Sequence, residues 1–125
     1  MELGESIVVK ATPEYLDDQS DPEDERYVFS YRIRISNQGQ QAATLRTRHW
    51  FITNGDGNVQ EVKGEGVVGE QPSIEPDDSY EYTSGAVLST PVGSMRGYYV
   101  MEAADGTLFH ANIPVFTLAS TNSLN

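Results

Sequence analysis

The pattern that decides the fold lies in residues 26–37 and reads Tyr27-Val28-Phe29-Ser30-Tyr31-Arg32-Ile33-Arg34-Ile35-Ser36. Large apolar side chains occupy every second position from Tyr27 to Ile35, and most of the positions between them are polar or charged. Side chains alternate between the two faces of a β-strand. This period of two therefore predicts a long strand with one buried face and one solvated face.

The rest of the chain predicts further strands separated by turns. We expect strands at residues 5–12, 43–53, 58–62, 79–83, 95–104 and 107–118. Turn signals rich in Gly, Pro, Asn and Asp lie at 37–40, 54–57, 76–78, 88–93 and 105–106. About seven short strands favour one domain, residues 1–125, folded as an antiparallel β-sandwich of immunoglobulin or fibronectin type III architecture. A Greek-key barrel is the alternative.

Two segments lack a strand pattern. The segment 13–25 predicts an acidic loop, whose carboxylates are Glu14, Asp17, Asp18, Asp21, Glu23, Asp24 and Glu25. We interpret these acids as a solvated loop or a guard on a sheet edge, with a divalent-cation site as the alternative. The polar tail, residues 119–125, is expected to be frayed.

The composition excludes several classes of function. The chain has 125 residues, a formal net charge of -11 and no cysteine. It therefore forms no disulfide, Cys-zinc site or thiol nucleophile, and it fits a reducing cytoplasm. The negative charge disfavours nucleic acid and anionic lipid. We find no signal-peptide pattern and no apolar run near the roughly 20 residues that span a membrane, so we expect a cytoplasmic protein that binds neither membrane nor nucleic acid.

The segment Lys63–Pro72 is rich in glycine, and its Gly64-x-Gly66-x-x-Gly69 has the letters of a dinucleotide fingerprint. That fingerprint requires a strand before it and a helix after it. Pro72 follows too soon for a helix, and Glu65 would repel a phosphate, so we reject a Rossmann site. Three interpretations remain: a purely structural loop, a backbone nest for pyrophosphate, and a protein-binding loop that exposes Val67 and Val68.

Catalytic and metal-binding patterns are incomplete. His49 and His110 are the only histidines, and we expect strand 95–104 to separate them by roughly 9–10 Å, too far to share one metal ion. Asn54-x-Asp56-x-Asn58 resembles the start of a calcium loop, but Val59 stands where that loop needs glycine, so a hairpin is predicted. There is no Gly-x-Ser-x-Gly motif. We expect no catalytic residues, no metal site, no cofactor and no enzymatic activity.

Arginine and aromatic residues gather on two strands. The facing of strand 43–53 is ambiguous, because large apolar side chains occur on both of its faces. If it pairs with strand 95–104, then Arg46, Arg48 and Arg96 could share a face with Tyr98 or Trp50. This composition is typical of protein-binding hot spots. The alternative is ordinary sheet-face charge, balanced by glutamates at 61 and 102.

Several motifs together resemble the ApaG family. They are the run Gly64–Pro72, Tyr82-Thr83-Ser84-Gly85, Thr90-Pro91-Val92-Gly93-Ser94-Met95-Arg96-Gly97, Ile113-Pro114-Val115-Phe116 and Arg48-His49-Trp50-Phe51-Ile52-Thr53. The resemblance covers nearly the whole chain, with the motifs in the family's order. The chain departs from the family at Pro76-Asp77-Asp78, where Pro-Gly-Glu is more usual.

The resemblance implies a fibronectin type III-like sandwich in a bacterial cytoplasmic protein. The family is associated genetically with cobalt and magnesium homeostasis and has no established enzymatic activity. Its relatives serve as accessory domains of some F-box proteins and of a DNA-polymerase-interacting protein, where protein binding is expected.

We therefore predict a non-enzymatic binding module with an unidentified protein partner. The alternative is a small-ligand binder, for a divalent cation or for a pyrophosphate-containing nucleotide at the glycine-rich loop. Exposed edge strands leave a homodimer open. The candidate binding residues are Gly64, Glu65, Gly66, Val67, Val68, Gly69, Gln71, Arg48, Trp50 and Arg96.

Overall fold

The computed structural model describes residues 2–120 of the protein. In this range the strands are β1 (Ile7–Tyr15), β2 (Tyr27–Asn37), β3 (Ala43–Asn54), β4 (Val59–Glu65), β5 (Ser73–Ile74), β6 (Ser79–Leu88), β7 (Val92–Ala103) and β8 (Leu108–Ala119). The helices are α1 (Leu3–Ser6) and two 3-10 turns, η1 (Asp17–Gln19) and η2 (Pro22–Asp24). None of them is long and apolar enough to cross a membrane.

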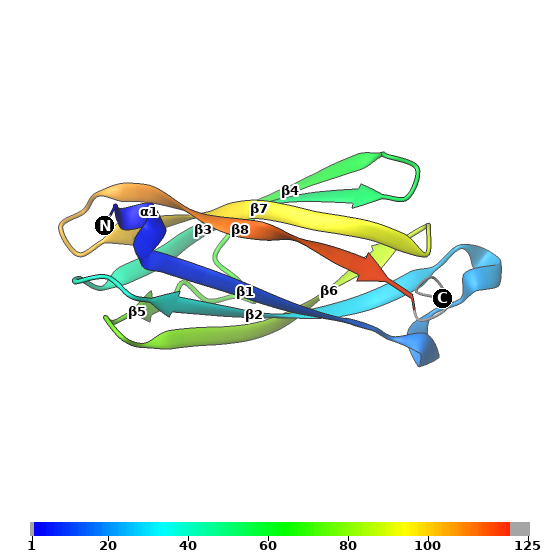
Figure 1. Ribbon diagram of the computed structural model, residues 1–125, viewed down its shortest axis with the longest axis horizontal. Coiled ribbons are helices and arrows are strands. Elements are labelled where there is room, and N and C mark those ends of the chain that lie inside the picture. The colour runs from blue at the N-terminus through cyan, green and yellow to red at the C-terminus, as the bar shows by residue number, and fades with distance from the viewer. Residues whose placement is uncertain (1, 121–125) are drawn as a thin grey trace.

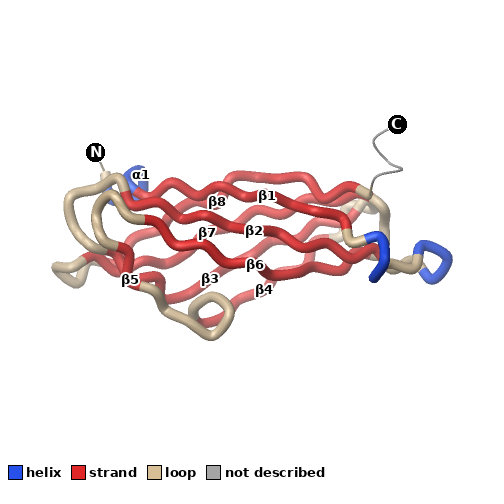
Figure 2. Tube along the Cα trace, turned by 90° about the horizontal axis from the view of Figure 1, so that it is seen from below, coloured by secondary structure: helices blue, strands red, loops and turns tan. Residues whose placement is uncertain are grey.

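The strands form two antiparallel sheets that lie face to face (Figure 1). One sheet has the order β1-β2-β6, and the other has the order β4-β3-β7-β8, with the short β5 paired to β3. Figure 2 shows the first sheet in front of the second. The predicted antiparallel sandwich is confirmed. It has eight strands in residues 2–120 rather than about seven, because β5 is too short to show a period.

The core lies between the two sheets. In β2 the side chains of Phe29, Tyr31, Ile33 and Ile35 are buried and those of the two arginines are exposed, which confirms the alternation that predicted this strand. From the facing sheet, the indole of Trp50 packs edge-on against Tyr31 with ring centroids 5.4 Å apart.

The predicted hairpins are also present. The side-chain oxygen of Asn54 accepts hydrogen bonds from the backbone N–H groups of Asp56 and Asn58, and Gly57 has a φ of 85°. These contacts close the β3–β4 turn. The hairpin therefore explains why Asn54, Asp56 and Asn58 resemble the start of a calcium loop, because β4 begins at Val59, directly after this turn. Asp105 and Gly106 make the β7–β8 turn in the same way.

The segment 13–25 is not the continuous loop that we predicted. β1 continues through Pro13 to Tyr15, whose backbone lies opposite Phe29, and η1 and η2 follow it. The low apolar content of residues 13–15 hid this extension from the sequence pattern. These residues form a strand because they pair with β2, not because of their own composition.

The predicted fraying of residues 119–125 is wrong for its first two residues. Ala119 is the last residue of β8, and the buried Ser120 donates its backbone N–H to the carbonyl of Pro91 at 2.9 Å. Polar composition does not prevent order where a neighbouring backbone group supplies a hydrogen bond. The remainder of the predicted tail lies outside the described residues.

Candidate functional site

Strand β3 positions two of the predicted binding residues, Arg48 and Trp50, and an irregularity in the strand decides which way they face. The register with β7 shifts between Leu45 and Thr47, so Arg46 lies in a β-bulge. Arg46 forms an ion pair with Glu102 at 3.0 Å, which confirms the interpretation that Glu102 balances sheet charge. Beyond the bulge, Trp50 points into the core.

The predicted arginine and aromatic patch is divided between two faces. β3 and β7 do pair, with Phe51 opposite Arg96. Trp50, however, is 2% exposed on the inner face and has no surface to offer a partner, which corrects its assignment as a contact residue. Arg96 lies on the outer face, with its guanidinium carbon 4.4 Å from the centre of the Phe51 ring. Alternation across the paired strands explains the separation.

Arg48 lies on the inner side of β3, beneath the glycine-rich loop. Its Nη1 donates hydrogen bonds to the carbonyl oxygens of Glu65 and Gly66, each at 3.0 Å. The guanidinium occupies the space that a side chain at Gly64 would fill. Among residues 2–120, Arg48 forms no ion pair with a carboxylate. Its guanidinium is therefore hydrogen-bonded to backbone carbonyls rather than paired with a carboxylate.

A pocket of about 210 Å³ opens beside Arg48. Its lining comprises Tyr31, Arg48, Trp50, Val67, Val68, Gly69, Tyr82 and Ser84. Burial raises the pKa of Tyr31, while a hydrogen bond with Ser84 and the charge of Arg48 partly oppose that rise. Burial likewise raises the pKa values of Tyr82 and Tyr99, whose hydroxyls are hydrogen-bonded. The pocket therefore presents neutral hydroxyl groups and one guanidinium.

The glycine-rich loop is shorter than predicted. Gly64 and Glu65 belong to β4, where they pair with Arg48 and Thr47, so the loop proper begins at Gly66. Gly64 of β4 and Gly66 of the loop look alike in sequence. Only the pairing of Gly64 with Arg48 of β3 distinguishes the strand residue from the loop residue.

Residues Val67–Glu70 form a tight turn with two backbone hydrogen bonds, of 2.8 and 2.9 Å, between Val67 and Glu70. Its central residues, Val68 and Gly69, have φ angles of 43° and 81°. Val68 is 57% exposed, as predicted, but Val67 is 0% exposed and the prediction that it is accessible is wrong. Val67 belongs to the core cluster and so fixes the loop to the sandwich.

Further contacts hold the loop in place. The side-chain amide of Gln71 and the backbone N–H of Gly66 both donate to the carbonyl of Arg46, each at 2.9 Å. Gly66 has a φ of 63°, and a side chain there would collide with the carbonyl oxygen of Glu70. The turn is therefore held rigidly, with Val68 at its tip.

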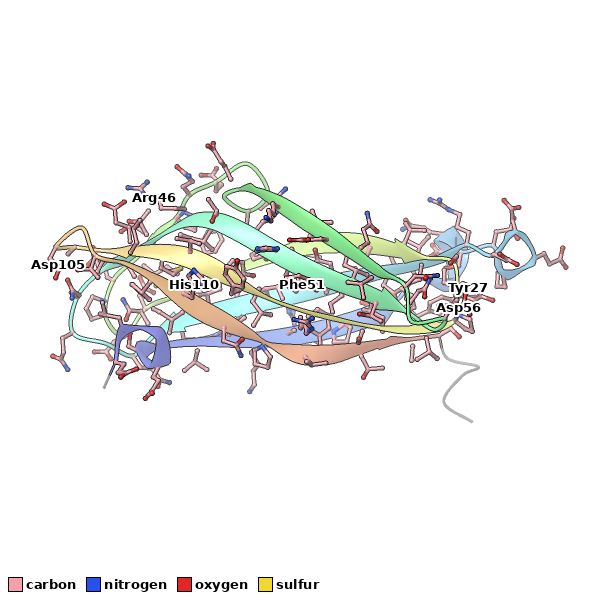
Figure 3. All side chains as sticks on the ribbon, turned by 90° about the horizontal axis from the view of Figure 1, so that it is seen from above. Tyr27, Arg46, Phe51, Asp56, Asp105 and His110 are labelled. Carbon is pink, nitrogen blue, oxygen red and sulfur yellow. The ribbon has the colours of Figure 1, made fainter. Side chains whose placement is uncertain are left out.

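The outer face of the second sheet carries a polar cluster that sequence reasoning missed. Figure 3 labels Phe51 and His110, whose rings stack on two members of this cluster, His49 and Tyr98. His49 Nε2 lies 2.6 Å from a carboxylate oxygen of Glu61, and His49 Nδ1 lies 2.7 Å from the hydroxyl of Tyr98. The hydrogen bond with His49 is the main cause that lowers the pKa of Glu61. The ring of Tyr98 stacks on His110 at 4.3 Å.

The two histidines lie on β3 and β8 with β7 between them, as the sequence predicted. Within residues 2–120, no group of three or more His, Asp or Glu side chains could hold a metal ion. The only sequence signal for the cluster was that His49 and Phe51, two positions apart, lie on the same face of one strand. Their partners on β4 and β7 could not be identified without the register of the sheet.

Comparisons with known proteins agree with the motifs. Residues 17–103 match the model of the ApaG domain family. The protein ApaG of Azoarcus sp. (strain BH72) is 56% identical over 119 residues, which cover 95% of this chain and 94% of that protein. The protein ApaG of Shewanella baltica (strain OS155) is 53% identical over 123 residues, or 98% of each chain.

A solved structure of a protein designated ApaA from Bordetella pertussis has a TM-score of 0.90 and 47% identity, covering 92% of this chain and 94% of that one. Sequence and backbone geometry thus agree over almost the full length. The chain belongs to the ApaG family.

Proposed function

We propose that the protein is a non-enzymatic, cytoplasmic protein-interaction module whose contact is centred on Val68. The observation that carries this proposal is the conformation of Val68, an exposed valine with a φ of 43°. Positive φ is a genuine outlier for a β-branched residue and costs about 1–3 kcal/mol. Because the Val68 side chain is largely exposed, little burial energy within the chain offsets that cost.

The loop around Val68 is organised to present it. Val67 is buried beneath it, Arg48 and Gln71 hydrogen-bond to the neighbouring backbone, and Gly66 allows the close turn. A contact that is held in place before binding loses less conformational entropy on association. An apolar side chain on a rigid tip suits a shallow apolar pocket on a partner protein. Under this proposal, any effect on cobalt or magnesium homeostasis is indirect.

Affinity capture from lysate tests the proposal. The immobilised wild type is compared with Val68→Asp and with a matched control, Val115→Asp, which changes a 65%-exposed valine on β8. We expect the wild type and the control to retain a protein that Val68→Asp loses. Identical partner lists for all three would contradict the role of the loop. Val67 is not used, since a charge there would disrupt the core.

A second candidate function is the binding of a small anion such as pyrophosphate in the Arg48 pocket. The observation that favours it is a guanidinium without a carboxylate partner among the described residues, beside the hydroxyls of Tyr31 and Ser84. A pocket of about 210 Å³ suits a small anion rather than a whole dinucleotide. For a divalent cation the candidate is the acidic segment 13–25, although no group of three or more of its carboxylates is arranged to hold a metal ion.

NMR titrations with pyrophosphate, magnesium and cobalt separate these ligands. Saturable shifts of the Gly66 and Gly69 amides with pyrophosphate, absent in Arg48→Met, would support the anion site. A lack of saturable shifts at millimolar concentrations of all three ligands would exclude both the anion site and the cation site. Small, diffuse shifts in the acidic segment alone would indicate ordinary counterion association.

A further inference from the structure

Tyr98, His49 and Glu61 form a hydrogen-bonded chain on the outer face of the second sheet. An ionised carboxylate only accepts hydrogen bonds, so Nε2 of His49 donates its N–H to Glu61. In the neutral imidazole, Nδ1 then accepts the hydrogen bond of the Tyr98 hydroxyl. A hydroxyl, a base and an orienting carboxylate within hydrogen-bond reach are the signature of an activated nucleophile.

The sheet holds these groups in a fixed geometry. His49 and Tyr98 are directly opposite one another on β3 and β7, and Glu61 lies on the adjacent β4, opposite Phe51. The ring of Phe51 stacks on that of His49 at 4.6 Å. The His49 side chain is only 13% exposed, so its orientation is restricted. The other partly exposed tyrosines, Tyr15, Tyr27 and Tyr80, have no such chain among the contacts of residues 2–120.

The surroundings of Tyr98 indicate which electrophile it would meet. A shallow cleft of about 410 Å³ beside it is lined by Thr47, Val100, Lys63, Glu65 and Arg48, among others. Lys63 lies 3.5 Å from Glu61 and is already partnered. A hydroxyl, an imidazole and a carboxylate joined in this order are the arrangement that acyl-transfer triads use. A carbonyl carbon is therefore the electrophile that this arrangement fits.

We propose that Tyr98 is a base-activated nucleophile that accepts an acyl group from an activated ester or thioester. The Tyr98 oxygen forms a bond to the carbonyl carbon while its proton passes to Nδ1 of His49. Glu61 stabilises the imidazolium that forms. The tetrahedral intermediate then loses its alcohol or thiol leaving group, which takes the proton from His49 and leaves an acyl ester on Tyr98. This property is independent of the Val68 contact.

Acetylation by p-nitrophenyl acetate tests the proposal on the full chain. Peptide mass mapping follows the acetyl group on each tyrosine, and hydroxylamine distinguishes the labile tyrosine ester from stable amides on Lys10 and Lys63. We expect Tyr98 to be acetylated faster than Tyr15, Tyr27 and Tyr80, with a normal solvent deuterium isotope effect. Equal rates at all four tyrosines would overturn the proposal.

Variants assign the role of each group. Removing a general base costs about 100-fold or more, so His49→Gln should slow acetylation of Tyr98 by that factor and abolish the isotope effect. Glu61→Gln keeps the shape and removes the orienting charge, and it should slow Tyr98 at least roughly tenfold. In both variants the rates at Tyr27 and Tyr80 serve as internal controls for folding and should not change.

Two further comparisons close the experiment. Tyr98→Phe should lose the hydroxylamine-labile adduct at this position, while Val68→Asp should retain the wild-type rate at Tyr98. Unchanged Tyr98 acetylation in His49→Gln would refute base activation. Failure here would leave the Val68 contact unaffected, because the capture experiment does not involve the outer face of β7.

Discussion

Two tight turns of the protein, Val67–Glu70 and Ala103–Thr107, both contain positive φ angles but use different residue types. In the β7–β8 turn, Gly106 has a φ of 89°, and the carboxylate of Asp105 accepts the backbone N–H of Thr107 at 3.0 Å. In the other turn, Gly69 has a φ of 81°, but the residue before it is Val68, which provides no side-chain cap.

This difference in residue type separates the β7–β8 turn, whose sequence favours its geometry, from the valine turn, whose sequence does not. Asp-Gly is a favoured hairpin sequence because both residues tolerate the required geometry. Valine tolerates it poorly, yet the surrounding contacts enforce it. The Asp-Gly turn is therefore explained by the stability of the hairpin. The valine turn is not explained in this way, and it is a functional candidate, which is the basis for placing the contact at Val68.

The largest predicted effect is that of Gly66→Ala, in the glycine that precedes the valine turn. Its φ is 63°, and a methyl group would collide with the carbonyl oxygen of Glu70, so we expect a loss of roughly 3 kcal/mol in the free energy of unfolding. Gly106→Ala faces open space and should lose only about 1 kcal/mol. Urea denaturation measures both. Equal losses of stability in the two variants would mean that the valine turn is no more constrained than the β7–β8 turn.

Val68→Asn should have a smaller effect of the opposite sign. Asn-Gly suits a two-residue turn with positive φ at both positions, so we expect the free energy of unfolding to rise by about 1 kcal/mol. The matched control, Val115→Asn, lies in β8 without positive φ and should not be stabilised. Denaturation and partner capture are measured together. A gain in stability with loss of capture supports the comparison, whereas a destabilised Val68→Asn contradicts it.

Much of the fold could be predicted because its signals are local. The alternation from Tyr27 to Ile35 and the turn residues Asn54 and Asp105 act within a few positions of themselves, and the structure confirms each of them. β5 and the extension of β1 to Tyr15 were missed, since both depend on a partner strand distant in sequence.

The candidate site was less predictable because it depends on register. The bulge at Arg46 sets the inward direction of Arg48 and Trp50, and no feature of the local sequence marks it. The burial of Val67 depends on the path of the loop, which brings this side chain into the core. The chain from Glu61 through His49 to Tyr98 needs three strands in one register, which no single-strand pattern contains.

The smallest predicted effect concerns pH and the β7–β8 turn. The side-chain hydroxyl and the backbone N–H of Thr107 hold the pKa of Asp105 below its usual value. The folded carboxyl therefore binds a proton less readily than the unfolded one, and its stabilisation is present above the unfolded pKa of about 3.9 and lost as pH falls below it. The advantage of the wild type over Asp105→Asn should accordingly shrink between about pH 5 and pH 2, by less than either change above.

The valine turn provides the control, because neither Val68 nor Gly69 titrates. The stability difference between Val68→Asn and the wild type should stay constant over the same pH range, as measured by urea denaturation at each pH. If that difference also varied with pH, the two turns would share an electrostatic environment, and the contrast between a capped turn and a strained one would need another cause.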